Sequence, residues 1–407
     1  MGRGYVALYL MIGAVILSAP IWYHIIALAS IAPARISTTN PEIAIENLNS
    51  QILSAEKLIG LHPERFELKK QLYKLLVTRA QYFGSYDDFK RLRELTSYIP
   101  TNVEEYLLKA KFLIVVHEFS DAEKMLSEIS RLAPENREVT RQMLPIRLAR
   151  RDNLAELQKT QTEEVKQNPS YGNLVLLSGI ESELGNFDQA DRHLERAIQS
   201  YRDSSPFPIA YLYFQRGLLW SEKAGDANRG KLYYSEAVHY LPQFVIGEVH
   251  LAELERAAGN TDNAIARLML VASSKDPEAR GKLSELLREK GSIQQAASYL
   301  DSSLNDYNYL LANYPFAFAD HGAEFFAGPG ANPNRALELA RMNLSNRKSE
   351  RAYLVAINAA LAADAANTPD AKKTLCELIS EAQLLKPVFV PLKELIQNAP
   401  IECRASR

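Results

Sequence analysis

The chain has 407 residues, of which 47% are hydrophobic and 24% are charged, and its formal net charge is -2. This composition excludes wholesale disorder, and the near-neutral charge argues against a broad nucleic-acid-binding face, which needs a surplus of Lys and Arg. The chain has two cysteines, Cys376 and Cys403, which are too few for a disulfide framework or a cysteine metal cluster.

The first 29 residues differ from the rest, because residues 5–29 contain no Asp, Glu, Lys or Arg. A helix of this length spans roughly 37 Å, enough for a hydrocarbon layer of about 30 Å. We expect residues 1–29 to form a signal-anchor with one transmembrane helix. The alternative is a cleaved signal peptide with Ala27-Leu28-Ala29 as its small-residue site, but the apolar run is long for a signal peptide.

The orientation of this segment rests on few charges. Arg3 precedes the apolar run, and Arg35 is the one basic residue close behind it. This small bias favours a cytoplasmic N-terminus and an exported remainder, as in a bacterial inner-membrane protein with a periplasmic domain.

Residues 30–40 form a short polar linker, and Pro41 begins a helix that we expect to run to about Gly60 as an N-terminal cap. Beyond it, prolines recur at intervals of 34 to 38 residues, and such a period is typical of stacked-helix repeats. They are Pro63, Pro100, Pro134, Pro169, Pro206, Pro242, Pro277 and Pro315. The period predicts a solenoid over residues 41–314.

Each interval contains two amphipathic helical stretches separated by a break. In the clearest interval, residues 171–203, Leu174 and Leu177 lie on the first stretch and Gly185 ends it. A small residue then stands five positions after the break, where two helices must approach closely. The positions expected to hold the turns and crossings are Gly185, Ala190, Ala197, Gly225, Gly230, Gly259, Ala264, Gly291 and Ala296.

At these positions the chain resembles the tetratricopeptide repeat family, whose 34-residue units consist of a helix A, a turn and a helix B. The resemblance implies an all-α, right-handed superhelical solenoid in which each repeat contacts its neighbours only. The helix-A Trp of that family is absent here, and Ala110, Ser178 and Ala252 stand where it has Gly. Sel1-like and pentatricopeptide repeats have similar periods, although the latter are expected to carry a basic groove.

The apolar pattern of residues 315–397 predicts divergent helix pairs and a terminal cap, with a long turn at residues 328–333. Residues 398–407 are expected to be a frayed tail. For Cys376 and Cys403 we favour free thiols, and a bridge that fixes the tail is the alternative in an oxidising compartment.

No motif of high specificity indicates catalysis, so we expect no enzyme, no cofactor and no metal. His321 and Glu324 stand at i,i+3 and could serve as a metal or acid–base pair, but a polar patch at the start of a helix is favoured, because metal sites need more ligands.

Residues 201–244 are rich in aromatic residues, which either pack in the core or line a ligand groove. The family's grooves use helix-A residues, and the resemblance therefore makes four residues candidates for protein binding. They are Glu181, Tyr213, Arg216 and Glu248.

We therefore expect a non-catalytic, membrane-anchored scaffold that binds protein partners in a membrane or cell-envelope complex, without nucleic acid or a small-molecule substrate. One alternative is a cytosol-facing receptor, similar in layout to mitochondrial outer-membrane import receptors. Another is an enzyme subunit with a site in residues 315–345.

Overall fold

The computed structural model describes residues 35–404, so the predicted anchor at residues 5–29 lies outside the described residues. It divides into a unit that ends at Thr38 and a compact unit, Thr39–Arg407. None of the helices in the described part is long and apolar enough to span a bilayer. The anchor therefore stays a prediction.

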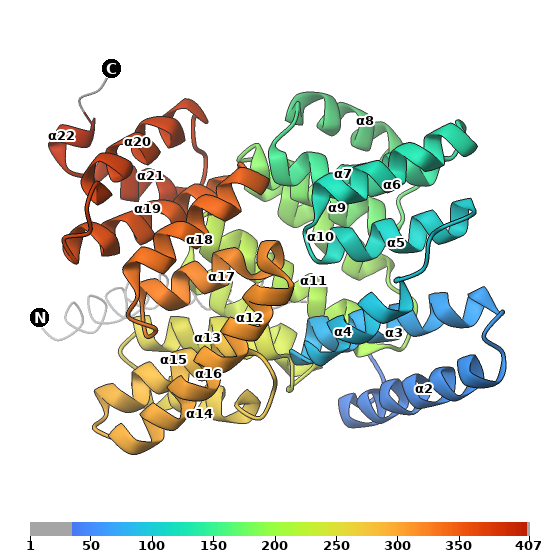
Figure 1. The fold of residues 1–407 in the computed structure, drawn as a ribbon, viewed down its shortest axis with the longest axis horizontal. Coiled ribbons are helices and arrows are strands. Elements are labelled where there is room, and N and C mark those ends of the chain that lie inside the picture. Colours follow the sequence, from blue (N-terminus) through green and yellow to red (C-terminus); the bar gives the residue numbers. More distant parts are fainter. Residues whose placement is uncertain (1–34, 405–407) are drawn as a thin grey trace, which may run out of the picture. The chain divides into compact units, whose positions relative to one another are not determined.

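The regular elements of the described residues are all helical (Figure 1). The first half consists of α2 (Pro41–Leu61), α3 (Phe66–Phe83), α4 (Asp87–Leu95), α5 (Val103–Val115), α6 (Phe119–Leu132), α7 (Arg137–Arg150), α8 (Leu154–Gln167), α9 (Tyr171–Glu183), α10 (Phe187–Ser200), α11 (Pro206–Leu218) and the π-helical turn η1 (Leu219–Lys223). The second half consists of α12 (Ala227–Tyr240), α13 (Val245–Ala257), α14 (Thr261–Val271), α15 (Pro277–Glu289), α16 (Ile293–Asn313), α17 (Pro315–Ala327), α18 (Pro333–Asn346), α19 (Glu350–Ala365), α20 (Ala371–Leu384), α21 (Val390–Gln397) and α22 (Ile401–Arg404).

Most of these helices pack in consecutive pairs of a helix A and a helix B, from α3–α4 to α19–α20, whereas α8 packs mainly on α9 rather than on α7. Local chemistry sets their ends. Ser170 caps α9 by accepting a hydrogen bond from the N–H of Asn173. Pro206 and Pro277 stand in the first turns of α11 and α15, where the N–H that proline lacks would have no partner within the helix. The predicted all-α stack of helix–turn–helix pairs is confirmed.

The turn between helix A and helix B contains a residue with positive φ in pair after pair. Gly185, Gly225, Gly259 and Gly291 have φ of 80°, 72°, 80° and 81°, in the left-handed region that glycine adopts without strain. After the turn, the small residues Ala190, Ala197, Ala264 and Ala296 are buried, and a Cβ on Gly230 would lie 2.5 Å from the Cβ of Ser221.

The stack also makes contacts over long sequence distances, contrary to the expectation that each repeat contacts its neighbours only. In five consecutive pairs, the positive-φ residue of the A–B turn lies against the start of a much later helix. The contacts are Gly84 with Asp276, His117 with Phe316, Arg151 with Glu350, Gly185 with Val388, and Gly225 with Val390. The chain therefore curves far enough for later pairs to pack on the turns of earlier pairs.

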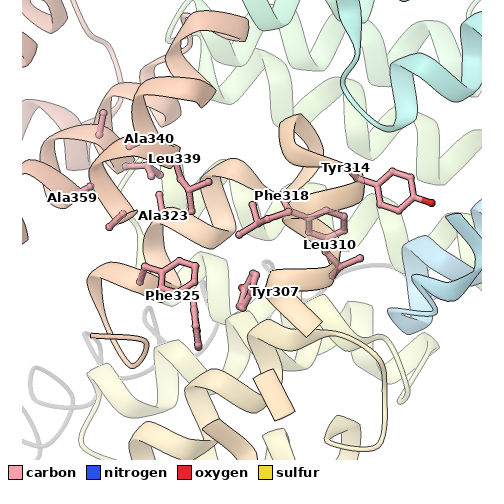
Figure 2. Packing of buried hydrophobic residues seen from close by; sticks show 14 of the residues in the cluster. Tyr307, Leu310, Tyr314, Phe318, Ala323, Phe325, Leu339, Ala340 and Ala359 are labelled. Carbon is pink, nitrogen blue, oxygen red and sulfur yellow. The ribbon is translucent and has the colours of Figure 1, made fainter. Parts of the chain in front are cut away.

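These long-range contacts are accompanied by one hydrophobic cluster, which joins residues of α2–α5 to residues of α16–α21. Figure 2 shows the part contributed by α16–α19, in which Tyr307 lies beside Phe325. From α4, the ring of Phe89 packs 5.4 Å from Tyr314 and 6.0 Å from Phe318, centroid to centroid. The N-terminal pair is thus held by residues more than 200 positions later in the chain.

The aromatic residues between 201 and 244 pack mainly in the core. Tyr213, Phe214, Tyr234 and Phe244 are buried, and the ring of Tyr82 from α3 lies 5.0 Å from that of Phe244. Of the two interpretations of this segment, core packing therefore describes most of it.

The C-terminal end differs from expectation. Cys376 and Cys403 form a disulfide, with their Cα atoms 4.4 Å apart, so the prediction of free thiols is wrong. Residues 401–404 form α22, which packs on α20 and buries Cys403, so the prediction of a frayed tail is wrong for these four residues. The physical reason is the return of the chain after α21, which brings two cysteines separated by 27 positions into contact.

Candidate partner-binding surface

The four residues predicted to bind a partner are all buried. Glu181 accepts hydrogen bonds from Gln158 and Asn186 at 2.7–3.1 Å, and these bonds tie α9 to α8 and to its own turn. Tyr213 stacks on Tyr240, with ring centroids 5.6 Å apart. Both side chains hold neighbouring helices together.

The two other candidates also form hydrogen bonds with residues of neighbouring helices. Arg216 donates two hydrogen bonds of 2.7 Å to the carboxylate of Asp191 and one of 2.8 Å to Tyr233, and Glu248 accepts one of 3.0 Å from Arg267. A partner would have to displace these internal contacts. Direct binding by the four residues therefore stays a prediction.

The structure brings His321 and Glu324 of α17 together with Glu278, which lies at the start of α15. Nδ1 of His321 lies 3.0 Å from a carboxylate oxygen of Glu278, and the ligand atoms of the three residues all lie within 4.8 Å of one another. The side chain of His321 is 43% exposed, so this group faces solvent.

A second residue of α15 and the neighbouring helix α13 extend this group. Lys282, one turn after Glu278 on α15, lies 3.4 Å from Glu278 and is in closer contact with Glu253 of α13. Nδ1 of His250, also on α13, lies 3.0 Å from Glu253. Three consecutive A helices therefore join their charges side by side.

Arg351 of α19 and Glu222 of η1 complete the set. Arg351 donates a hydrogen bond of 2.7 Å to Glu324 and lies 3.8 Å from Glu222. The π-helical turn η1 ends α11 out of the regular helical phase, as such turns often do at functional positions, and it carries both Glu222 and Lys223. We call the eight residues the ionic cluster: Glu222, His250, Glu253, Glu278, Lys282, His321, Glu324 and Arg351.

Mutual attraction keeps these groups charged. Burial would lower the pKa of His321, but the carboxylates of Asp320 and Glu278 outweigh burial and raise that pKa to about 10. Burial also opposes the charge on Glu253, yet Lys282 and the imidazole of His250 lower the pKa of its carboxyl to about 2. The imidazole of His321 and the carboxyl of Glu253 are therefore charged at neutral pH.

This charge state bears on the chemistry that His321 and Glu324 can perform. Two carboxylates and an imidazole are a donor set for a divalent cation, but a protonated His321 is no ligand, and Glu278 and Glu324 already have cationic partners. A general acid or base works best with a pKa near the operating pH, which the pKa of His321 is not. The arrangement favours ionic recognition over catalysis.

A cavity of about 410 Å³ adjoins the ionic cluster, and Glu253 and Lys282 belong to both. Its other lining residues come from α13, α14 and α15: Ala252, Arg256, Ala257, Leu268 and Leu286. Four of its lining residues are apolar and three are charged, a mixture that is common in ligand pockets.

No protein-family model matches the sequence, and no curated protein matches it. Among solved structures, the chain is similar to one in the crystal structure of the APC/C hetero-tetramer Cut9–Hcn1, with a TM-score of 0.43 and 14% identity over 82% of this chain. This chain spans 63% of the length of that one. It is also similar to yeast Tom70, with a TM-score of 0.32 and 13% identity over 88% of this chain and 93% of the other. These likenesses are to helical architecture and say nothing about function.

Sequence reasoning found two members of the ionic cluster and missed the other six. A signal for three basic members exists in the sequence: His250, Lys282 and His321 stand nine or ten residues before the positive-φ residue of their A–B turns. Arg351 and Glu222 do not share this register, because they stand 16 and three residues before the positive-φ residues Asn367 and Gly225.

Proposed function

We propose that this protein is a non-catalytic scaffold that binds protein partners through its stacked helix pairs. The single observation that carries the proposal is the ionic cluster, a solvent-facing array of charges from α13, α15, α17, α19 and η1 beside an apolar cavity. Ionic contacts of this kind select partners and orient them more than they add raw affinity.

The test is capture of partners by the full-length chain from gently solubilised native membranes after brief crosslinking. We compare the natural chain with the double variant Lys282→Glu and Arg351→Glu, which reverses the charge of two cluster cations. A matched control is Lys373→Glu together with Lys393→Glu, two exposed lysines far from the cluster in sequence.

A reproducible set of partners that is lost in the cluster variant and kept in the control supports the scaffold. A natural chain that captures nothing in native membranes contradicts it. Circular dichroism of both variants establishes that the helical fold is retained.

We further propose that residues 5–29 anchor the protein in a membrane and that the solenoid lies on the exported, oxidising side. The uncharged N-terminal segment supports the anchor. The Cys376–Cys403 disulfide supports the compartment, because such bonds persist mainly outside the reducing cytosol.

Protease protection in sealed membrane vesicles whose cytosolic face is turned outward tests this orientation. Protection of the solenoid from a protease on the cytosolic side, with the disulfide oxidised on isolation, is the expected result. Digestion from the cytosolic side, with both thiols free, would instead favour the cytosol-facing receptor. A protein that partitions entirely into the aqueous fraction after alkaline extraction would contradict the anchor.

A further inference from the structure

Residues 386–390, which we call the strap, join α20 to α21 and run across two consecutive A–B turns. Its residues 386–389 have no regular secondary structure, the backbone of Phe389 is extended, and Val390 begins α21, so Val388 and Val390 stand two positions apart. A Cβ built on Gly185 would lie 2.9 Å from the Cβ of Val388, and one on Gly225 would lie 2.8 Å from a methyl of Val390. The two turns therefore hold two aliphatic side chains of one short segment that leads into α21.

Polar groups fix the strap in this place. The buried carboxylate of Glu350 accepts hydrogen bonds of 2.9 and 2.8 Å from the N–H groups of Val388 and Phe389. The ammonium of Lys223 lies 4.9 Å from the centre of the buried Phe389 ring and also pairs with Glu183 at 3.0 Å. The Glu183–Lys223 pair bridges the ends of the two A helices whose turns the strap covers.

The next two turns have the same build, and no segment within residues 35–404 covers them. Gly259 and Gly291 have nearly the φ of Gly185, and no atom of the described residues lies within 4 Å of the position that a Cβ would take at either glycine. Beneath them, Arg256 pairs with Glu289 across the ends of α13 and α15, as Glu183 pairs with Lys223 beneath the strap.

The cavities between the A helices correspond as well. Ser178, Gly179, Ser182 and Leu194 line a cavity of about 160 Å³ at positions seven, six and three before and nine after Gly185. Ala252, Glu253, Arg256 and Leu268 line the 410 Å³ cavity at the same positions relative to Gly259. Lys223, which lines the smaller cavity, is the residue that contacts Phe389.

We propose that the edge formed by the turns at Gly259 and Gly291 binds an extended segment of a partner protein with an aliphatic–aromatic–aliphatic sequence. The two aliphatic side chains lie on the glycine turns, and the aromatic side chain enters the 410 Å³ cavity. The chain's own strap shows that a pair of such turns holds this kind of segment. The inference rests on the proposed scaffold function and names the chemistry of its partner.

The test uses the full-length protein and a fluorescent peptide with the sequence of residues 385–392, measured by anisotropy. The variant Ala257→Trp fills the cavity from an exposed position, and Ala258→Trp is the matched control, because Ala258 is also exposed and does not line the cavity. We expect Ala257→Trp, or the change Phe389→Ala within the peptide, to weaken binding about tenfold or more, because aromatic anchors dominate such contacts. We expect Ala258→Trp to change it little.

Three results would overturn the proposal. They are absence of binding at millimolar peptide, equal binding to the two tryptophan variants, and photo-crosslinking of the peptide to the turns at Gly185 and Gly225, which would mean that it displaces the strap. Sedimentation at increasing concentration adds a fourth: self-association lost in Ala257→Trp would make a second copy the occupant. If Ala257→Trp still captures all partners from membranes, the scaffold stands and this docking edge is wrong.

Discussion

The turns at Gly185 and Gly225 and those at Gly259 and Gly291 have the same backbone conformation and opposite surroundings. The first two are covered by the strap, whereas the second two have no neighbour within 4 Å of the Cβ position among residues 35–404. The same local sequence pattern produces both kinds of turn, since each turn ends a helix A with a glycine in the left-handed conformation. Whether a turn becomes core or surface therefore depends on what the chain places against it some 165 to 200 residues later.

The ion pairs beneath the two regions differ in the same way. Glu350, under the strap, is fully buried and holds two backbone N–H groups as well as Arg151. Glu289, under the open turns, is 46% exposed and pairs with Arg256. Removing the partners of a buried charge strongly lowers the free energy of unfolding, whereas water replaces the partners of an exposed charge.

The largest difference should appear on deletion of these carboxylates. Glu350→Ala leaves two buried N–H groups of the strap unsatisfied and removes one of the two carboxylates that pair with Arg151, so we expect a loss of about 3–5 kcal/mol in unfolding free energy. Glu289→Ala should lose only about 0–1 kcal/mol. Urea titration followed by circular dichroism measures both, and equal losses would mean that the strap is not held as described.

Removal of the disulfide should act on the strap region alone. The bond closes the chain between Cys376 and Cys403, a loop that contains the strap. The double change Cys376→Ser and Cys403→Ser should reduce the unfolding free energy by about 2–4 kcal/mol. Hydrogen exchange should rise in residues 386–397 and stay unchanged in residues 245–291. A uniform rise over both segments would contradict a local role.

Alanine substitution at the glycines isolates the contact with the strap. Gly185→Ala and Gly259→Ala both impose a left-handed conformation on a residue with a Cβ, at about 1–2 kcal/mol each. At Gly185 the added Cβ also meets Val388, which should add about 1–3 kcal/mol. The same denaturant titration compares the two variants. A larger loss at Gly259 than at Gly185 would reverse the assignment of covered and open turns.

Two histidines should give the smallest effects, with opposite dependence on pH. Burial lowers the pKa of His117 to about 4, so its neutral form stabilises the fold above its ordinary pKa of 6.5, and this contribution is lost as the pH falls from 6.5 to about 4. The pKa of His321 is raised to about 10, so its contribution is full below pH 6.5 and is lost as the pH rises from 6.5 to about 10.

Thermal melting between pH 4 and 10 tests both signs. His117→Asn keeps a residue that tolerates the left-handed turn and should flatten the acid side of the profile, whereas His321→Gln should flatten the alkaline side. A profile whose alkaline side is unchanged in His321→Gln would mean that the ionic cluster does not hold the imidazolium.

The sequence predicts the helix pairs well because their causes are local. Prolines at the first turns of α11 and α15 and left-handed glycines at the A–B turns act within a few residues of where they stand. The candidate site was predicted poorly. The spacing of His321 and Glu324 along one helix indicates that they are a pair. Glu278, Lys282 and Arg351 join this pair from other helices, and a local sequence pattern contains no information about contacts between helices.

By itself, the sequence determined the all-α class, the period of the repeats and the positions of their turns, because hydrophobic spacing, proline and glycine restrict the backbone within each pair. Only the tertiary structure decided that Val388 covers Gly185 while Gly259 stays open, that Cys376 meets Cys403, and that charges of five elements form one cluster. The physical reason is curvature. Small rotations between successive pairs add up along the stack, and their sum places residues two hundred positions apart in contact.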